Sequence, residues 1–175
     1  MRSRRWLFGA LAALAALAMV FVAGGASAQV GKLDRLEVIQ SGLYSANVAR
    51  RDSSPGTPTG KASIVDKPSF YSDESRVPAQ LGVRFGFQYR LIGSPQGREA
   101  RLRGVWHIPA PGITNPVSGN IYRQSARDFT ALIGDTQIHG YGFDQPWEIV
   151  EGEWVLEIWH NERLLASRSF VVGKP

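Results

Sequence analysis

The segment 139–147 carries the side chains best suited to bind a ligand. Its aromatic rings, Tyr141, Phe143 and Trp147, alternate with polar residues that include Asp144. Aromatic rings stack on the apolar faces of sugars, and neighbouring polar groups fix the orientation of a bound ligand. The same large rings could instead fold inward and close one end of the core, because aromatic residues are mostly buried. The sequence leaves both alternatives open.

Three carboxylates could supply acid and base chemistry: Asp135, Asp144 and Glu148. Such groups can meet across loops without any local sequence signature. The alternative is that they are solvated, or cap turns in their loops. A serine nucleophile would need a Gly-x-Ser-x-Gly elbow before a helix, and the sequence contains no such motif. We therefore expect no enzyme activity and no catalytic residue.

The chain also lacks a recognisable metal motif. His107, His139 and His160 are its only histidines, and cysteine is absent. A metal site needs two or three ligands at short fixed spacing, and no histidine here has such a neighbour. We expect no metal and no cofactor, and the absence of cysteine excludes disulfides and thiolate chemistry.

These side chains must be positioned by β-strands, because the dominant period of the sequence is two. Every odd position from 81 to 91 is apolar, whereas the even positions are mostly polar or glycine. This alternation predicts a half-buried strand. It also predicts a core between two sheets, to which six residues contribute: Phe85, Phe87, Tyr89, Trp106, Trp154 and Leu156.

Clusters of Gly, Pro and Ser separate the alternating segments, and no stretch after the first 28 residues has a convincing helical period. The pattern predicts an all-β fold, an immunoglobulin-like antiparallel β-sandwich of about seven strands. The strands are expected near 33–48, 61–70, 81–92, 100–109, 127–139, 150–159 and 164–172.

Four arginines fall on the polar phase of two consecutive predicted strands: Arg84, Arg90, Arg101 and Arg103. If the turn at 93–97 joins these strands as a hairpin, the shared basic face could bind an anionic glycan or a lipid headgroup. The alternative is that Glu153 and Glu157 pair with Arg84 and Arg90 on an adjacent strand, since an immunoglobulin-like sheet would place 150–159 there. We favour the ion pairs.

Residues 1–28 have the layout of a secretory signal: an arginine-rich start, an apolar run and the small residues Ala26 and Ala28. We expect a signal-peptide helix at 1–28, cleavage before Gln29, and a single β-sandwich domain over 29–175. The alternative is an uncleaved membrane anchor. Cleavage would leave no stable membrane span and a periplasmic or secreted protein.

Charge gives little support for a nucleic-acid partner. Three of the 20 Lys and Arg residues lie in the first 28 positions, which leaves 17 cations against 15 anions in the predicted mature chain. A balance of +2 carries no strong basic field, and export removes the domain from nucleic acid.

Five segments resemble one bacterial family. They are SGLY at 41–44, VPAQLGVRFGF at 77–87, PGITNP at 111–116, GYGFDQPW at 140–147 and GEWVLEIW at 152–159. Together they are similar to the domain of unknown function 3859. The resemblance implies a compact, sandwich-like domain that is exported or resides in the cell envelope, and it supplies no reaction, ligand or catalytic residue.

The sequence thus favours a non-catalytic accessory module that binds an envelope protein. The alternative is a small-ligand or glycan-binding module that uses Tyr141, Phe143, Asp144 and Trp147.

Overall fold

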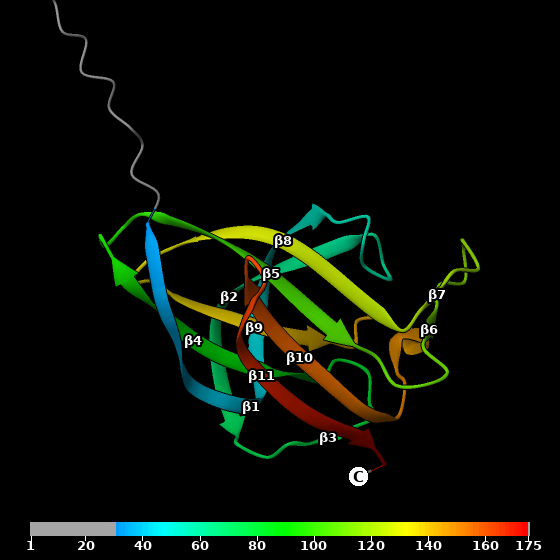
Figure 1. The fold of residues 1–175 in the computed structure, drawn as a ribbon. Coiled ribbons are helices and arrows are strands. Elements are labelled where there is room, and N and C mark those ends of the chain that lie inside the picture. The colour runs from blue at the N-terminus through cyan, green and yellow to red at the C-terminus, as the bar shows by residue number, and fades with distance from the viewer. Residues whose placement is uncertain (1–30, 175) are drawn as a thin grey trace, which may run out of the picture.

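Two β-sheets make up most of residues 31–174, the part of the chain that the computed structural model describes (Figure 1). The predicted signal peptide, 1–28, and its cleavage site lie outside the described residues. Between residues 31 and 174 no helix has the length and apolar character needed to cross a membrane.

The first sheet has the strand order β2 (Lys61–Ser72), β1 (Lys32–Ser53), β4 (Arg84–Ser94) and β9 (Thr136–Gly142). The second has the order β3 (Arg76–Pro78), β11 (Arg163–Gly173), β10 (Gly152–His160), β5 (Glu99–His107) and β8 (Gln124–Leu132). Only the β3–β11 pair is parallel. A small hairpin of β6 (Ile113–Thr114) and β7 (Ile121–Tyr122) and the 3-10 turn η1 (Pro146–Glu148) complete the fold.

The core lies between the sheets, where the period-two pattern places it. Phe85, Phe87 and Tyr89 of β4 are fully buried, and so are Trp154 and Leu156 of β10. The predicted all-β sandwich is therefore confirmed. Its layers are joined by aromatic contacts, such as the edge-on packing of Phe85 and Trp154 with ring centroids 5.7 Å apart.

Three details of the predicted strands are wrong. The segment 127–139 is two strands, β8 and β9, because a turn at 133–135 reverses the chain. Leu81 is exposed and precedes β4, which begins at Arg84. Trp106 packs against the edge of the core and is only partly buried, and its indole N–H donates to the Gly140 carbonyl at 3.1 Å.

Strand β1 changes partner along its length. Its first half pairs with β4 as far as Leu43, and its second half pairs with β2 from Leu43 onward. Residues 44–72, which we call the β1–β2 arm, therefore extend past the end of β4. The tip of the arm is fastened to the rest of the molecule, because Ser125 of β8 donates to the Gly56 carbonyl at 3.1 Å and Asn115 donates to the Pro58 carbonyl at 2.7 Å. The fastened arm forms one wall of a pocket.

Candidate functional site

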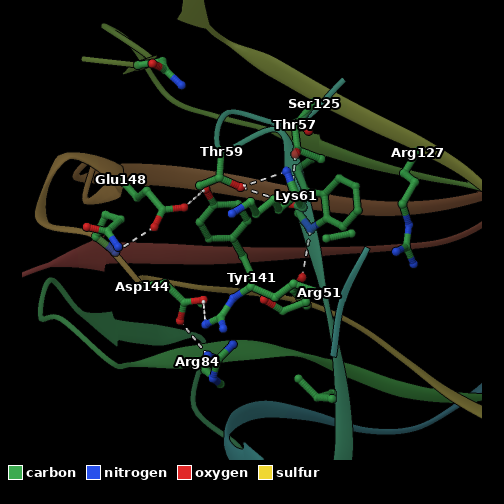
Figure 2. Close-up of a pocket in the computed structure, with 18 of the residues that line it drawn as sticks. Arg51, Thr57, Thr59, Lys61, Arg84, Ser125, Arg127, Tyr141, Asp144 and Glu148 are labelled. Atoms are coloured by element: carbon green, nitrogen blue, oxygen red, sulfur yellow. Dashed lines mark hydrogen bonds and ion pairs between the residues drawn. The ribbon is translucent and has the colours of Figure 1, made fainter. Parts of the chain in front are cut away.

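A pocket of about 640 Å³ lies between the β1–β2 arm, the strands β8 and β9, and the loop that leads into η1 (Figure 2). Its lining is mainly polar and charged, with several aromatic side chains. The residues that matter most are Arg51, Lys61, Arg127, Tyr141, Asp144 and Glu148. The pocket therefore draws on segments that are far apart in the sequence.

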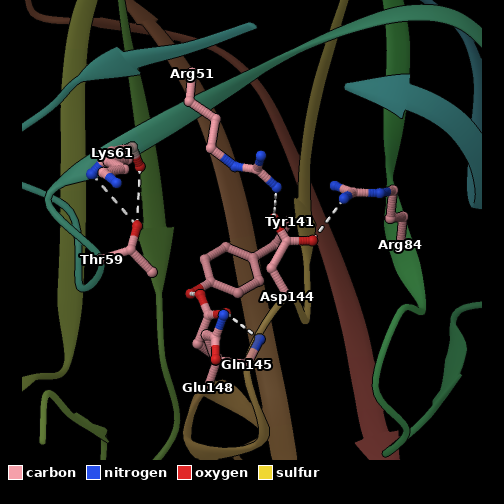
Figure 3. A network of polar contacts seen from close by, with 8 residues as sticks. All are labelled: Arg51, Thr59, Lys61, Arg84, Tyr141, Asp144, Gln145 and Glu148. Atoms are coloured by element: carbon pink, nitrogen blue, oxygen red, sulfur yellow. Dashed lines mark hydrogen bonds and ion pairs between the residues drawn. The ribbon is translucent and has the colours of Figure 1, made fainter. Parts of the chain in front are cut away.

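Asp144 lies between two arginines at one side of this pocket (Figure 3). Its Oδ1 accepts from Arg84 at 2.6 Å, and its Oδ2 lies 3.5 Å from Nη2 of Arg51. Arg84 is largely buried, with 13% of its side chain exposed. The neighbouring Tyr44 hydroxyl is buried, which raises the pKa of Tyr44 to about 12 although the positive charge of Arg84 opposes the shift. Asp144 thus joins β4 to the β1–β2 arm.

Glu148 is the second carboxylate of the pocket, and it is nearly fully buried. Its Oε1 accepts from the Tyr141 hydroxyl at 2.9 Å, and its Oε2 accepts from the backbone N–H of Gln145 at 2.7 Å (Figure 3). Burial raises the pKa of Glu148 above the usual carboxyl value. Burial and the nearby carboxylates also raise the pKa of Tyr141 well above that of a free phenol, so this hydroxyl stays a donor.

The structure separates the four candidate ligand-binding residues into two groups. Tyr141, Asp144 and Trp147 line the pocket. Phe143 has no exposed surface and packs in the core, with its ring centroid 5.6 Å from that of Phe85 and 5.9 Å from that of Trp154. The segment 139–147 therefore contributes both to the core and to the pocket. Tyr141 takes part in both, since it lines the pocket and its ring centroid lies 4.8 Å from that of Trp154.

Two of the three candidate acid and base residues share the pocket. Asp144 and Glu148 both line it, whereas Asp135 is exposed in the turn between β8 and β9. Each pocket carboxylate has two partners in the protein. Asp144 accepts from Arg84 and forms an ion pair with Arg51, and Glu148 accepts from Tyr141 and from the backbone of Gln145. Both carboxylates therefore link separate parts of the chain at the pocket wall.

The three histidines lie apart and have different partners. His107 is 3.1 Å from Glu157, His160 is 2.8 Å from the Arg101 carbonyl, and His139 is buried. Across residues 31–174 no group of three or more His, Cys, Asp or Glu residues is placed to hold a metal ion.

The predicted pairing of Arg84 and Arg90 with Glu153 and Glu157 is wrong. It assumed that β10 lies beside β4, but β10 pairs with β5 and β11 in the opposite sheet. Arg84 pairs with Asp144 instead, and Glu157 accepts from the indole of Trp159 and contacts His107.

The predicted shared basic face is absent too, because β4 and β5 belong to different sheets. The turn at 93–97 crosses from one sheet to the other instead of forming a hairpin. Arg103 lies near Asp128 of β8 at 3.4 Å.

Sequence reasoning missed Arg51, Lys61 and Arg127, which supply the basic side of the pocket. Arg51 lies near the end of β1, Lys61 begins β2, and Arg127 lies on β8. Nothing in their local spacing differs from that of ordinary surface cations. These three cations reach one cavity because the β1–β2 arm folds onto β8. A long-range contact of this kind leaves no periodic pattern in the sequence.

Acid should destabilise the fold through His139. Burial lowers the pKa of His139 to about 3 from the ordinary 6.5, so the ring stays neutral in the folded state and its Nε2–H donates to the Val105 carbonyl at 3.3 Å. As the pH falls, His139 takes up a proton in the unfolded chain before it does so in the folded protein. Its contribution to stability is therefore fully present above the ordinary pKa and is lost progressively as the pH drops below it. We expect a loss of about 2 kcal/mol between pH 7 and pH 5, measured by urea unfolding.

The control for this effect is the His139→Gln variant, whose amide can still donate to Val105 and which keeps His107 and His160. Its unfolding free energy should lack the same loss over this interval. An equal loss in both proteins would assign the acid sensitivity to another group.

The fold defines the structural class of the protein. Two packed sheets around an aromatic core make this an immunoglobulin-like sandwich, and a crystal structure of an immunoglobulin-like protein from Pseudomonas aeruginosa is similar to it with a TM-score of 0.53. The two chains are 25% identical, and the similarity covers 82% of this chain and 100% of that one.

The sequence profile of the family described as domain of unknown function (DUF3859) matches residues 33–172. The chain belongs to this family. A β-glucosidase of Erythrobacter marinus matches with a TM-score of 0.33 and 12% identity, over 58% of this chain and 14% of the enzyme, which is too weak to inform function. No curated protein sequence matches the chain.

Proposed function

We propose that this protein is an exported, non-catalytic accessory module that binds a small polar ligand or glycan in the pocket beside 139–147. The observation that supports it most is the pocket itself. Its volume of about 640 Å³ lies within the range of roughly 300 to 1,000 Å³ that is usual for small-molecule sites. Aromatic side chains and hydrogen-bonding groups line it together, as in sites that orient a sugar.

The alternative ligand is an envelope protein, which the sequence favoured. A concave pocket closed on one side by a fastened arm suits a small molecule better than a flat protein surface, so we place the small ligand first. The non-catalytic assignment is supported by Asp144 and Glu148, whose oxygens are occupied by donors from the protein. The periplasmic or secreted location is supported by the sequence pattern of residues 1–28 alone.

Titration of ¹⁵N-labelled protein with a panel of neutral and acidic oligosaccharides tests the proposal. We expect saturable shifts of the amide signals around Tyr141, Gly142 and Gln145. The Tyr141→Leu variant should bind about tenfold more weakly, because it loses the ring face that packs on a sugar.

The matched control is Tyr71→Leu, since Tyr71 is exposed on the β1–β2 arm and does not line the pocket. Its affinity should equal that of the wild type, and circular dichroism should show that both variants are folded. The absence of saturable shifts with every panel member, or shifts confined to another face, would contradict a ligand site in this pocket.

A further inference from the structure

The charges around the pocket do not balance. Four cations line it, Arg51, Lys61, Arg84 and Arg127, whereas the carboxylates that line it are Asp144 and Glu148. Arg84 and Arg51 share Asp144. Within residues 31–174, no carboxylate oxygen lies within 4.0 Å of the charged groups of Lys61 or Arg127. The pocket therefore has two cations without a counter-charge in contact.

Arg127 is the more unusual of the two. Its Nε is buried and has no hydrogen-bond partner in the described part of the chain, and its guanidinium carbon lies 5.3 Å from the centre of the Phe129 ring. Burial lowers the pKa of Arg127, with Asp52 and Tyr89 acting on it from a longer range. Figure 2 shows Arg127 reaching from β8 with no contact drawn to it, whereas Asp144 is joined to Arg51 and Arg84.

A buried N–H without an acceptor is costly, so proteins rarely retain one unless a water, an ion or a ligand satisfies it. The Tyr89 hydroxyl is a second buried polar atom without a partner, and it feels the charge of Arg127. The two terminal nitrogens of a guanidinium can donate two parallel hydrogen bonds to one carboxylate. Nε is the one nitrogen of Arg127 that is buried without a partner, and Arg127 lines the pocket, so the terminal end of its guanidinium matches a carboxylate in both charge and hydrogen-bonding geometry.

The other residues that line the pocket suit a ligand with a ring and hydroxyl groups better than a bare anion. The pocket lining includes three partly buried aromatic rings, those of Tyr141, Trp106 and Trp147, and Thr59 and Ser63 add hydroxyl groups. A free phosphate would use none of these rings, whereas a sugar ring would use both kinds of group.

We propose that the ligand of this pocket is an acidic saccharide, whose carboxylate binds Arg127 with the help of Lys61 while its ring packs against the aromatic wall around Tyr141. This inference rests on the proposed function, and it adds the chemical class of the ligand and the residue that anchors it. Arg127 on this account is a binding residue that the free protein keeps unpaired.

The test compares two probes with the same sugar backbone, trigalacturonate and its fully methyl-esterified form, in which each carboxylate is a neutral methyl ester. Binding is measured by isothermal titration calorimetry at low and high salt. We expect the acid to bind at least about tenfold more tightly than the ester at low salt, and its advantage to shrink as salt screens the pocket. Inorganic phosphate, as a third probe, should compete only weakly.

Arg127→Met should reduce the affinity for the acid to that of the ester and leave the affinity for the ester within about twofold. Its stability should equal or exceed that of the wild type, since the buried Nε–H that lacks a partner is replaced by an apolar group. Lys61→Met changes an exposed residue and should give a smaller loss in the same direction. Arg90→Met, at an exposed arginine outside the pocket, should change nothing.

The outcomes separate the two proposals. If neither saccharide binds, the proposed function fails and this inference fails with it. If both saccharides bind equally and neither Arg127→Met nor Lys61→Met alters their ratio, the glycan site stands and the acidic ligand is refuted. If phosphate competes as strongly as trigalacturonate binds, the saccharide is refuted as the ligand class.

Discussion

Replacing Phe87 by Ala should lower the free energy of unfolding by roughly 3 to 5 kcal/mol, because the phenyl ring is removed from a site that cannot collapse around the cavity. Phe87 lies in the middle of β4 and has no exposed surface. Its ring centroid is 5.9 Å from that of Tyr89 and 5.6 Å from that of His139. Both neighbours belong to paired strands of the same sheet, so they cannot move inward without breaking the β4–β9 ladder. Equilibrium urea unfolding measures the loss.

The matched control is Tyr71→Ala, which also removes an aromatic ring from a strand of the first sheet. Tyr71 is 62% exposed, so its loss should change stability by no more than about 0.5 kcal/mol. A cost below about 1 kcal/mol for Phe87→Ala would mean that the ring is not in the core.

The inward face of β4 could be predicted because the period of a strand is a local property. Phe85, Phe87, Tyr89 and Leu91 alternate with polar residues and glycine, and all four are fully buried. The alternation has the same physical cause in every strand, since successive side chains point to opposite faces. The apolar phase of a strand therefore identifies its buried face whatever its neighbours are.

The neighbours themselves could not be predicted. Strand β10 was expected beside β4, yet it lies in the opposite sheet between β11 and β5. An apolar residue such as Trp154 would face the core equally well if its strand lay in the other sheet. Which sheet a strand joins depends on long-range packing and on the loops, and single-strand patterns do not record it.

The site shows the same division. Tyr141, Asp144 and Trp147 stand out because aromatic and polar residues are dense in one loop. Lys61 and Arg127 lie on separate strands and gain their relation only when the tip of the β1–β2 arm meets β8. The Nε of Arg127 is buried without a partner only because of how the pocket folds. The sequence around position 127 gives no sign of it.

A row of three glycines makes the geometry of the arm possible. Gly42 of β1 faces Gly86 of β4, and Gly86 faces Gly140 of β9. The row crosses the first sheet where β1 leaves β4 to pair with β2. The Tyr44 hydroxyl comes so near to Gly140 that a Cβ there would lie 2.7 Å from it. Because these three residues have no side chains, the side chain of Tyr44, at the start of the arm, can lie directly on the backbone of β9 beside the pocket.

Gly86→Ala should therefore lower the free energy of unfolding by about 3 kcal/mol or more, the upper end of the cost of overpacking. A Cβ at Gly86 would meet the carbonyl oxygen of His139 and lie 2.5 Å from the Cα of Gly140. Both are backbone atoms, which cannot escape by changing rotamer, so β4 and β9 must separate at the edge of the pocket. Urea unfolding gives the loss, and hydrogen exchange should show weakened protection of the β9 amides. Gly173→Ala is the control, because a Cβ there has no atom within 4 Å, and it should stay within about 0.5 kcal/mol of the wild type. Equal effects of the two substitutions would show that β9 does not need the close approach of the glycine row.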